Sequence, residues 1–397
     1  MPGALDGLLV LDLSRVLAGP YATQLLGDFG ARVVKVEQPG RGDETRAWGP
    51  PFTPGGQSAY FLAANRNKES LALDLKTAGG RSVLRDLARR ADVLIENFKV
   101  GTMDALGLGY GALRAENSGL VYCAITGYGQ DGPYAARPGY DTVIQAQGGL
   151  MSVTGAADGE PQKVGVAVVD ITAGLYAATS ILAALQHRAR TGAGQQIDLA
   201  LFDVQLSWLA NVGSAYLVSG QAPERYGNAH ATIVPYQPFR ASDGHLMVAV
   251  GNDGQFARLC AALGRPEWAA DPRFASNPAR VANRETLVPM IEAIFAGRRV
   301  AEWERDLVAA GVPCGPVNDV PAALADPQAL ARQMVREVTD DRGEVVRLVG
   351  PAPRLSVTPP AVRLAPPRLG QHTESILRDL LGYDEARLAA LRADGTI

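Results

Sequence analysis

Strand-like and helix-like segments alternate along the first two hundred residues, and this alternation most restricts how the chain can fold. The strand-like segments are rich in Val, Leu and Ile, and several are apolar almost without interruption. Strands that are apolar on both faces are typical of a parallel sheet covered by helices on both sides. We therefore expect a wound α/β sheet, with strands at residues 8–13, 31–37, 70–75, 92–98, 120–125 and 164–169.

Helical periodicity fills the gaps between these strands and continues beyond them. A further strand and a long helix are expected within 195–220, and the Gly- and Pro-rich residues 220–244 resemble a domain junction. After the junction we expect a strand at 245–250 and a short one within 313–319. The Pro-rich chain beyond residue 350 predicts an extended arm. The helices are expected near 21–30, 79–91, 140–149, 172–188, 254–263, 284–296, 300–310 and 373–381.

Composition and charge exclude several classes of protein. A length of 397 residues is typical of two or three domains, and a hydrophobic content of 47% is enough to form their cores. A formal net charge of −3 argues against a general binder of nucleic acid or anionic membranes. No apolar run is expected to span a membrane, and the first residues lack a basic leader. We therefore expect a cytoplasmic protein with no nucleic-acid or membrane partner.

The metal-ligating residue types are few and dispersed. Cys123, Cys260 and Cys314 are odd in number and far apart, so they fit neither a disulfide framework nor a zinc spacing. The four histidines are also scattered along the chain. We therefore expect reduced structural thiols and no metal site.

Several nucleotide and hydrolase motifs are missing from the sequence. The first strand–helix turn reads LSRVLAGPYATQ and lacks the G-x-G-x-x-G of dinucleotide-binding folds. No Walker A motif and no G-x-S-x-G nucleophile elbow occurs. A nicotinamide oxidoreductase, an NTPase and a serine hydrolase therefore lose their main support.

The stretch KVGVAVVDITAGLYA places one acid, Asp170, between an apolar run and a helix. Asp is a favoured N-cap, because its carboxylate accepts the free N–H groups of the first turn. Ligands of wound sheets also bind beyond the carboxyl ends of the strands, where a carboxylate is available for chemistry. The residues alone leave both interpretations of Asp170 open. Lys76 and Lys99 also follow strand ends, and they fit a solvated surface as well as phosphate contact.

A long, ordered set of motifs resembles one known family. The motifs include GDFGARVVKVEQPGRGDETRAWGP, NRNKESLALDLK, ITGYGQDGPYAARPGYDTVIQAQGGLMSVTG, KVGVAVVDITAGLYA, TGAGQQIDLALFD, YGNAHATIVPYQPF and GVPCGPVND. In this order they resemble the class III CoA-transferases, which include formyl-CoA and L-carnitine CoA-transferases. The α-methylacyl-CoA racemases belong to the same family.

The resemblance implies an α/β fold with two parts. A large Rossmann-like domain is formed by both chain ends, a smaller α/β domain lies between them, and two subunits interlock as a homodimer. The implied boundaries are 1–200 for the N-terminal part of the large CoA-binding domain, 201–225 for a linker helix region, 226–330 for the small domain, and 331–397 for the return linker and the C-terminal part of the large domain. The extended segments near 200–244 and 330–365 are the expected linkers.

The resemblance also implies the site residues. Asp170 corresponds to the family's covalent nucleophile, and the loop Tyr226–Gln237, with its single Gly227, to a small-domain loop at the site mouth. Gln38 and Ala105 stand where some members have basic CoA contacts, so Lys99, Arg41 and Arg137 become the phosphate candidates. The implied CoA contacts are Leu17, Ala18, Leu73, Asp74, Leu75, Lys76, Asn97, Phe98, Lys99, Arg137, Gly139, Tyr140 and Asp141.

The implied activity is an acyl-CoA:carboxylate CoA-transferase that works without a metal. CoA moves from a donor, with succinyl-CoA expected, to a small carboxylic acid through an aspartyl-CoA thioester. Arg46 and His230 are candidates for holding the acceptor carboxylate, and Trp48 for the site mouth, although solvation or packing explains each as well. Two alternatives remain: an acyl-CoA racemase, which in this family needs a His where this chain has Tyr140, and a non-catalytic CoA-binding protein.

Overall fold

The computed structural model describes residues 3–397, and its contacts divide them into two compact units. Unit 1 comprises 3–150, 164–217 and 327–397, so both ends of the chain contribute to it. Unit 2 comprises 151–163 and 218–326. Each unit has its own sheet and its own hydrophobic core.

The sheet of unit 1 has six strands, and every neighbouring pair is parallel. The strand order β3-β2-β1-β4-β5-β6 reverses direction between β1 and β4, as in doubly wound nucleotide-binding folds. This confirms the parallel α/β sheet that the sequence predicts. The strands are β1 Leu9–Asp12, β2 Arg32–Glu37, β3 Lys68–Ala72, β4 Val93–Glu96, β5 Val121–Thr126 and β6 Gln196–Ala200.

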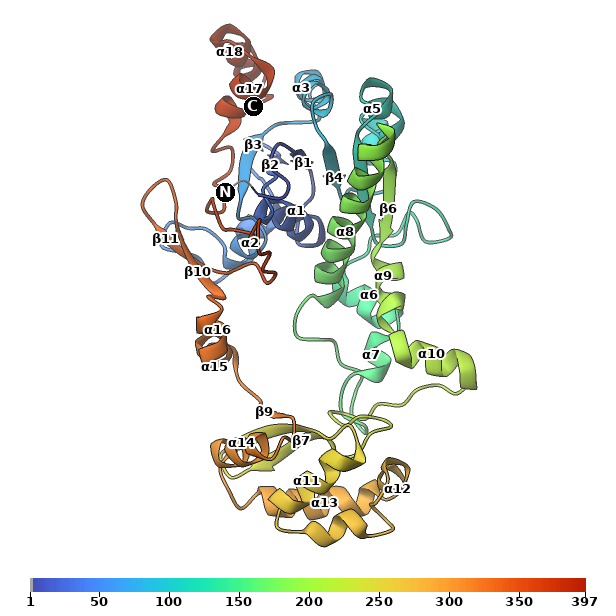
Figure 1. Cartoon of the computed structure of the whole chain (residues 1–397). Coiled ribbons are helices and arrows are strands. Elements are labelled where there is room, and N and C mark those ends of the chain that lie inside the picture. Colours follow the sequence, from blue (N-terminus) through green and yellow to red (C-terminus); the bar gives the residue numbers. More distant parts are fainter. Residues whose placement is uncertain (1–2) are drawn as a thin grey trace. The chain divides into compact units, whose positions relative to one another are not determined.

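Helices cover both faces of this sheet (Figure 1). Alternate residues of β1 show the division, since Val10 packs into one core and Leu9 and Leu11 into the other. The core with Val10 includes α1 Ala18–Asp28, α6 Asp141–Gln147, α8 Val168–Thr191 and α9 Leu201–Trp208. The core with Leu11 includes α3 Ala78–Ala88, α5 Tyr110–Glu116, α17 Thr373–Leu381 and α18 Glu385–Ala393.

Shorter elements complete unit 1 and its junctions. The hairpin of β10 and β11 packs Val346 and Leu348 against Leu62 of α2. The bounds are η1 Glu44–Ala47, α2 Ala59–Ala63, α4 Thr102–Ala105, α7 Leu150–Val153, α10 Ala210–Ser219, α15 Val320–Ala325, α16 Pro327–Ala331, β10 Val335–Thr339 and β11 Val345–Val349.

Unit 2 is a three-stranded antiparallel sheet with helices packed on it. Its core centres on Phe239, Phe295 and Trp303, with ring centroids 5.0 and 4.7 Å apart in succession. The expected helices and both expected strands of this region are confirmed. The elements are β7 Tyr236–Ala241, β8 Gly244–Ala249, α11 Asp253–Ala262, η2 Pro266–Ala270, α12 Asn277–Ala282, α13 Arg284–Phe295, α14 Val300–Ala309 and β9 Cys314–Pro316.

The strand expected at 164–169 is wrong, because α8 already begins at Val168 and the sixth strand is β6. Val168 and Val169 are apolar because the first turn of α8 is buried on the sheet, and a short apolar run does not distinguish this from a strand. The 24-residue α8 is also long and apolar enough to cross a membrane by length and composition alone, contrary to the expectation of no such run. Half of its most apolar window is buried inside the protein.

Two further expectations need correction. Residues 236–241 of the expected junction form β7, which pairs only with β8, and such an edge strand tolerates Pro238. The long helix expected within 195–220 is divided into α9 and α10 at Ala210, whose φ of 40° interrupts the helical backbone. The helix expected near 373–381 is confirmed as α17, and α18 follows it without having been predicted.

Candidate active site

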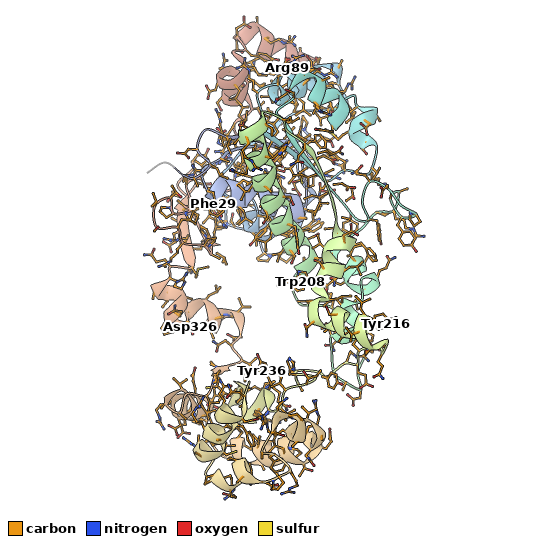
Figure 2. All side chains as sticks on the ribbon, turned by 45° about the vertical axis from the view of Figure 1, so that its right-hand side comes forward. Phe29, Arg89, Trp208, Tyr216, Tyr236 and Asp326 are labelled. Carbon is orange, nitrogen blue, oxygen red and sulfur yellow. The ribbon has the colours of Figure 1, made fainter. Side chains whose placement is uncertain are left out.

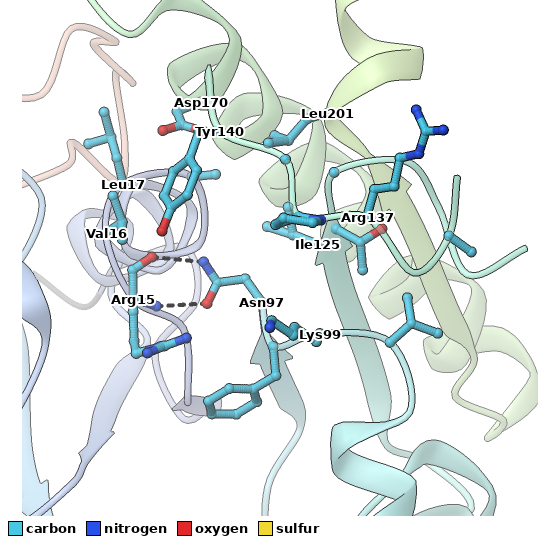
Figure 3. A pocket seen from close by; sticks show the side chains of 18 of the residues that line it. Arg15, Val16, Leu17, Asn97, Lys99, Ile125, Arg137, Tyr140, Asp170 and Leu201 are labelled. Carbon is cyan, nitrogen blue, oxygen red and sulfur yellow. Dashed lines mark hydrogen bonds between the residues drawn. The ribbon is translucent and has the colours of Figure 1, made fainter. Parts of the chain in front are cut away.

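A cavity of about 160 Å³ opens at the carboxyl ends of β1, β4 and β5 in unit 1 (Figure 3). This edge lies at the switch point of the sheet, because the strands on its two sides lead into helices on opposite faces. Its lining comprises Arg15–Ala18 after β1, Asn97–Val100 after β4, Ile125–Gly127 at the end of β5, Ala135–Tyr140, and Glu44, Asp170 and Leu201.

Asp170 enters this cavity from the first turn of α8. Ala167 occupies the N-cap position, so the interpretation of Asp170 as the cap of this helix is wrong. The cap function belongs to Asp141, whose Oδ1 accepts the N–H groups of Val169 and Asp170 at 2.8 and 3.3 Å. The resemblance implied only a CoA contact for Asp141, and the structure buries this residue beneath the start of α8.

The buried Asp141 is itself fixed by α6. The amide nitrogen of Gln145 donates to Asp141 Oδ2 at 2.6 Å, and Gln145 Oε1 accepts the N–H of Val164 at 2.9 Å. The first contact lies within α6, and the second joins α6 to the segment that leads into α8. The position of Asp170 is therefore set by two helices and not by a strand end.

Burial, and to a lesser extent the like charge of Asp141, raise the pKa of Asp170 to about 7. The sequence led us to expect that the helix N-terminus would keep this carboxylate ionised, because its N–H groups favour negative charge. Removal from water outweighs that effect here. Near neutral pH Asp170 therefore exists in both its ionised and its protonated form.

Tyr60 of α2 is in the same electrostatic environment, a relation that the sequence did not reveal. Burial raises the pKa of its phenol, and the charges of Asp170, Asp141 and Asp43 add to this. Trp48 packs edge-on against Tyr60 with ring centroids 5.0 Å apart, and it is 41% exposed. Trp48, the aromatic residue expected at the site mouth, thus packs against Tyr60, whose pKa is affected by the charge of Asp170.

The loop between β1 and α1 forms one wall of the cavity. Asn97 holds this loop with both ends of its amide: Oδ1 accepts the N–H of Arg15 at 2.9 Å, and Nδ2 donates to the Arg15 carbonyl at 2.8 Å (Figure 3). Asn97, which the resemblance assigned to CoA contact, therefore also fixes the backbone that follows the neighbouring strand β1.

A second cavity of about 280 Å³ adjoins the first through Arg15 and Phe98, which line both. The Arg15 guanidinium lies 5.4 Å from the Phe98 ring centroid, and its Nη1 pairs with Glu44 at 2.7 Å. The sequence did not lead us to expect Arg15 as a site residue, although its position just after the first strand could have indicated it. The lining comprises Leu13, Arg15, Val36, Glu37, Gln38, Gly42, Asp43, Leu73, Asp74, Leu75, Lys76, Phe98, Thr102 and Leu106.

The two cavities bring together most of the residues expected to bind CoA. Leu17, Ala18, Asn97, Lys99 and the stretch Arg137–Tyr140 line the first. Leu73–Lys76 line the second, and Phe98 lines both. Of the expected contacts, only Asp141 lines neither cavity.

The basic candidates differ in their surroundings. Lys99 and Arg137 line the first cavity, and the Arg137 guanidinium stacks 3.9 Å from the Tyr134 ring centroid. Lys76 lines the second cavity, whereas Arg41 lines neither. Cations at both cavities are suited to the phosphates of CoA.

Arg46 has a different environment from the one expected. Its Nε and Nη2 donate to the two carboxylate oxygens of Glu37 at 2.8 and 2.7 Å, and Nη1 donates to the Pro367 carbonyl. Its guanidinium also stacks 3.8 Å from the Phe61 ring centroid. These contacts engage the whole guanidinium, so Arg46 serves as an internal ion-pair partner and is not a free anchor for an acceptor.

His230 and the loop Tyr226–Gln237 belong to unit 2. His230 Nδ1 accepts the N–H of Thr232 at 3.1 Å, and its ring lies 5.3 Å from that of Tyr236. Gly227 adopts a φ of 61°, in the left-handed region. Among residues 3–397, no three His, Cys, Asp or Glu side chains are grouped so as to hold a metal ion.

Known proteins resemble this chain over its whole length. The model of CoA-transferase family III matches residues 5–373. Succinyl-CoA:glutarate CoA-transferase of Mus musculus is 42% identical over 99% of this chain and 90% of its own. Succinate–glutarate CoA-transferase of Agrobacterium fabrum (strain C58) is 46% identical over 95% of each chain.

A solved structure gives the same answer in three dimensions. The CaiB/BaiF family protein from Brucella suis superposes with a TM-score of 0.87 at 47% identity, covering 96% of this chain and 100% of its own. Likeness at this level, over nearly the full length of both chains, identifies a common family. The protein belongs to CoA-transferase family III and is an enzyme of the class III CoA-transferases.

Proposed function

We propose that the enzyme moves CoA from succinyl-CoA to a short dicarboxylic acid, with Asp170 as the covalent nucleophile. The observation that carries this proposal is the half-buried carboxylate of Asp170, with its raised pKa, in the cavity at the sheet's switch point. Two of the similar enzymes are named for transfer between succinate and glutarate. They support succinyl-CoA as the donor and a dicarboxylate as the acceptor.

The proposed reaction proceeds through four substitutions at carbonyl carbon. The ionised Asp170 attacks the thioester of the donor, releasing CoA thiolate and leaving a mixed anhydride. The thiolate then attacks the aspartyl carbonyl, which releases succinate and leaves an aspartyl-CoA thioester. The acceptor carboxylate attacks this thioester and expels the thiolate again. The thiolate finally attacks the acceptor's carbonyl, forming the product thioester and freeing Asp170.

The electrostatics of Asp170 suit this sequence. A carboxylate with a pKa of about 7 is more basic than an ordinary one and remains available in its ionised form at neutral pH. The half-buried position of Asp170 limits the access of water, which would otherwise hydrolyse an anhydride or an aspartyl thioester. The same environment thus supports both the nucleophile and its intermediates.

The two joined cavities provide a path for CoA. We propose that its thioester end reaches Asp170 in the first cavity, while Leu73–Lys76 and Phe98 hold the remainder in the second. Lys76, Lys99 and Arg137 supply positive charge for the phosphates. This path includes most of the contacts that the sequence predicts.

We also propose a homodimer. α8 exposes Leu175, Tyr176 and Leu182 along one side, and Figure 2 shows Trp208 and Tyr216 on α9 and α10, where both side chains are exposed. Large apolar side chains gathered on one unit are typical of a surface that another chain covers. A second copy of this chain is the partner we propose.

The racemase alternative lacks a second acid–base group of the expected kind. The position that holds a His in the racemases holds Tyr140 here, and its side chain lines the first cavity. A phenol is a poor proton acceptor near neutral pH, so the exchange of an α-proton is not favoured. Transfer of CoA requires no such partner.

The test separates covalent transfer from proton exchange. The enzyme is incubated with succinyl-CoA without an acceptor and treated with hydroxylamine, and its peptides are analysed by mass spectrometry. We expect a hydroxamate on the peptide containing Asp170, and none with Asp170→Ala. A chiral 2-methylacyl-CoA in deuterated water should gain no α-deuterium. Deuterium uptake without a hydroxamate would replace the transferase by the racemase.

A further inference from the structure

Val16, in the wall of the first cavity, has an unusual backbone conformation. Its φ is 70°, in the left-handed region that β-branched residues rarely adopt. Such conformations persist only where the surroundings impose them, and they concentrate at ligand sites. Val16 lines the same cavity as Asp170 and immediately precedes Leu17 and Ala18.

Asp43 is the group that holds Val16. The N–H of Val16 points between the two carboxylate oxygens of Asp43, at 3.2 Å from each. Asp43 also caps η1 through the N–H and the hydroxyl of Thr45, at 3.0 and 2.8 Å. Asp43 is 1% exposed, so the carboxylate belongs to the interior although it serves a loop.

The residues before Val16 in this loop are fixed in the same way. Ser14 donates its N–H and hydroxyl to Asp12, and its carbonyl accepts from Lys35 Nζ at 2.8 Å. Arg15 is held by Asn97 through both backbone groups. Side chains of four different strands or loops thus fix three successive residues.

A network of ion pairs lies beneath the loop between β1 and α1. Lys35 Nζ is 3.0 Å from Asp43 and Lys68 Nζ is 2.9 Å from Asp12, with all four side chains fully buried. Arg46 pairs with Glu37, whose Oε1 accepts the N–H of Asp43. Three cations therefore balance three carboxylates.

The network keeps Asp43 charged. Burial opposes its ionisation, but Lys35 and the donors of Thr45 outweigh that effect and lower the pKa of Asp43. A buried ion pair is weak evidence for stability, because apolar residues of similar volume often serve as well. A charged carboxylate offers something that they cannot, namely two strong acceptors for the N–H of a strained residue.

We propose that Asp43 is a positioning residue that holds Val16 in the left-handed conformation and so fixes the wall along which the CoA thioester meets Asp170. The inference rests on the proposed function and extends it to a residue that the resemblance did not assign. Asp43 acts through Val16, and Lys35 and the network beneath it keep the carboxylate ionised and in place.

The test compares two buried carboxylates. Asp43→Asn removes the charge from the clamp on Val16. Asp28→Asn is the matched control, since Asp28 is 3% exposed and accepts from Arg66 at 2.8 and 2.6 Å but lines neither cavity. We expect both variants to melt at lower temperature. Per folded molecule, only Asp43→Asn should lose kcat/KM, by at least 30-fold.

A second substitution tests whether Asp43 acts through Val16. Gly adopts a positive φ without a steric cost, so Val16→Gly should lessen the need for the clamp. We expect Asp43→Asn/Val16→Gly to recover at least fivefold in kcat/KM over Asp43→Asn, which a purely stabilising role of Asp43 would not produce. The inference would be overturned if Asp43→Asn and Asp28→Asn lost kcat/KM equally. It would also be overturned if Val16→Gly restored no activity to Asp43→Asn.

Two further arms keep the result decisive. Should Asp43→Asn not fold, Lys35→Met/Asp43→Asn removes both charges of the pair, with and without Val16→Gly. Calorimetric binding of CoA is measured on every variant beside turnover. A wild-type enzyme that transfers no CoA overturns the proposed function, and the recovery by Val16→Gly in CoA affinity then decides the role of Asp43 alone.

Discussion

Among single residues, Asp170 is the one that we propose forms a covalent bond to the substrate. We expect Asp170→Ala and Asp170→Asn to abolish CoA transfer while the fold is retained, as measured by steady-state kinetics and circular dichroism. Retention of a tenth of the wild-type kcat/KM would contradict the covalent role, since tenfold is only about 1.4 kcal/mol of barrier.

The raised pKa of Asp170 predicts a pH dependence of the first half-reaction. The proposed nucleophile is the ionised form of Asp170, so the rate of hydroxamate formation should fall as the pH decreases through about 7. Asp141→Asn keeps an oxygen acceptor for the N–H of Val169 but removes the like charge. We expect Asp141→Asn to move the acid limb, which is the pH range over which the rate falls, to lower pH. A limb that stays in place would mean that another group controls the rate.

The same shift affects stability in the opposite sense. The pKa of Asp170 rises from 3.8 to about 7 on folding, so between these values the folded state holds a proton that the unfolded state has released. Stability is therefore lost as the pH rises through this range. We expect Asp170→Asn to be more resistant to urea than the wild type at pH 8. The difference should narrow towards pH 5, and a constant difference would contradict the assignment.

Among the elements, the packing of α8 on α1 sets where Asp170 stands. Gly174 lies one turn after Asp170, and a Cβ there would approach the Ala18 carbonyl oxygen to 2.8 Å. The backbone of Ala18 cannot move without shifting α1, so Gly174→Ala should push α1 and α8 apart. We expect a loss of about 1–3 kcal/mol in stability and at least tenfold in kcat/KM, read by urea denaturation and kinetics.

Gly111 of α5 is the matched control for that substitution. A Cβ at Gly111 meets nothing within 4 Å, and the residue lies within a helix. Gly111→Ala should therefore raise stability by about 0.5–1 kcal/mol and leave turnover unchanged. An equal loss of activity in both variants would show that the α1–α8 contact does not position Asp170.

At the scale of the whole molecule, the exposed apolar side chains of α8, α9 and α10 predict the proposed dimer. We expect sedimentation at micromolar concentration to give twice the mass of one chain. Leu175→Glu/Leu182→Glu places two charges on the exposed side of α8 and should shift the protein towards monomer or aggregate. A wild-type monomer that retains activity would contradict the dimer.

The strands of the sheet and most of its helices can be predicted from the sequence alone. Five of the six apolar runs became strands, because strands covered on both faces bury every residue and this leaves a continuous pattern in the chain. Hydrophobic periodicity likewise located α3, α11, α13 and α14. The family resemblance named Asp170 and the CoA contacts, and all of these except Asp141 line the two cavities.

The contacts between groups at the carboxyl edge of the sheet join segments that are distant in the sequence, so they become visible only in the folded chain. Asp141 caps α8 from 29 residues away, and Asp43 holds Val16 across 27 residues, so no local pattern could reveal either contact. The run 164–169 was ambiguous for the same reason, because the burial of Val168 and Val169 depends on the sheet beneath them. Ionisation also depends on the tertiary surroundings: burial, with Asp141 adding to it, raises the pKa of Asp170, whereas Lys35 and Thr45 outweigh burial and lower the pKa of Asp43.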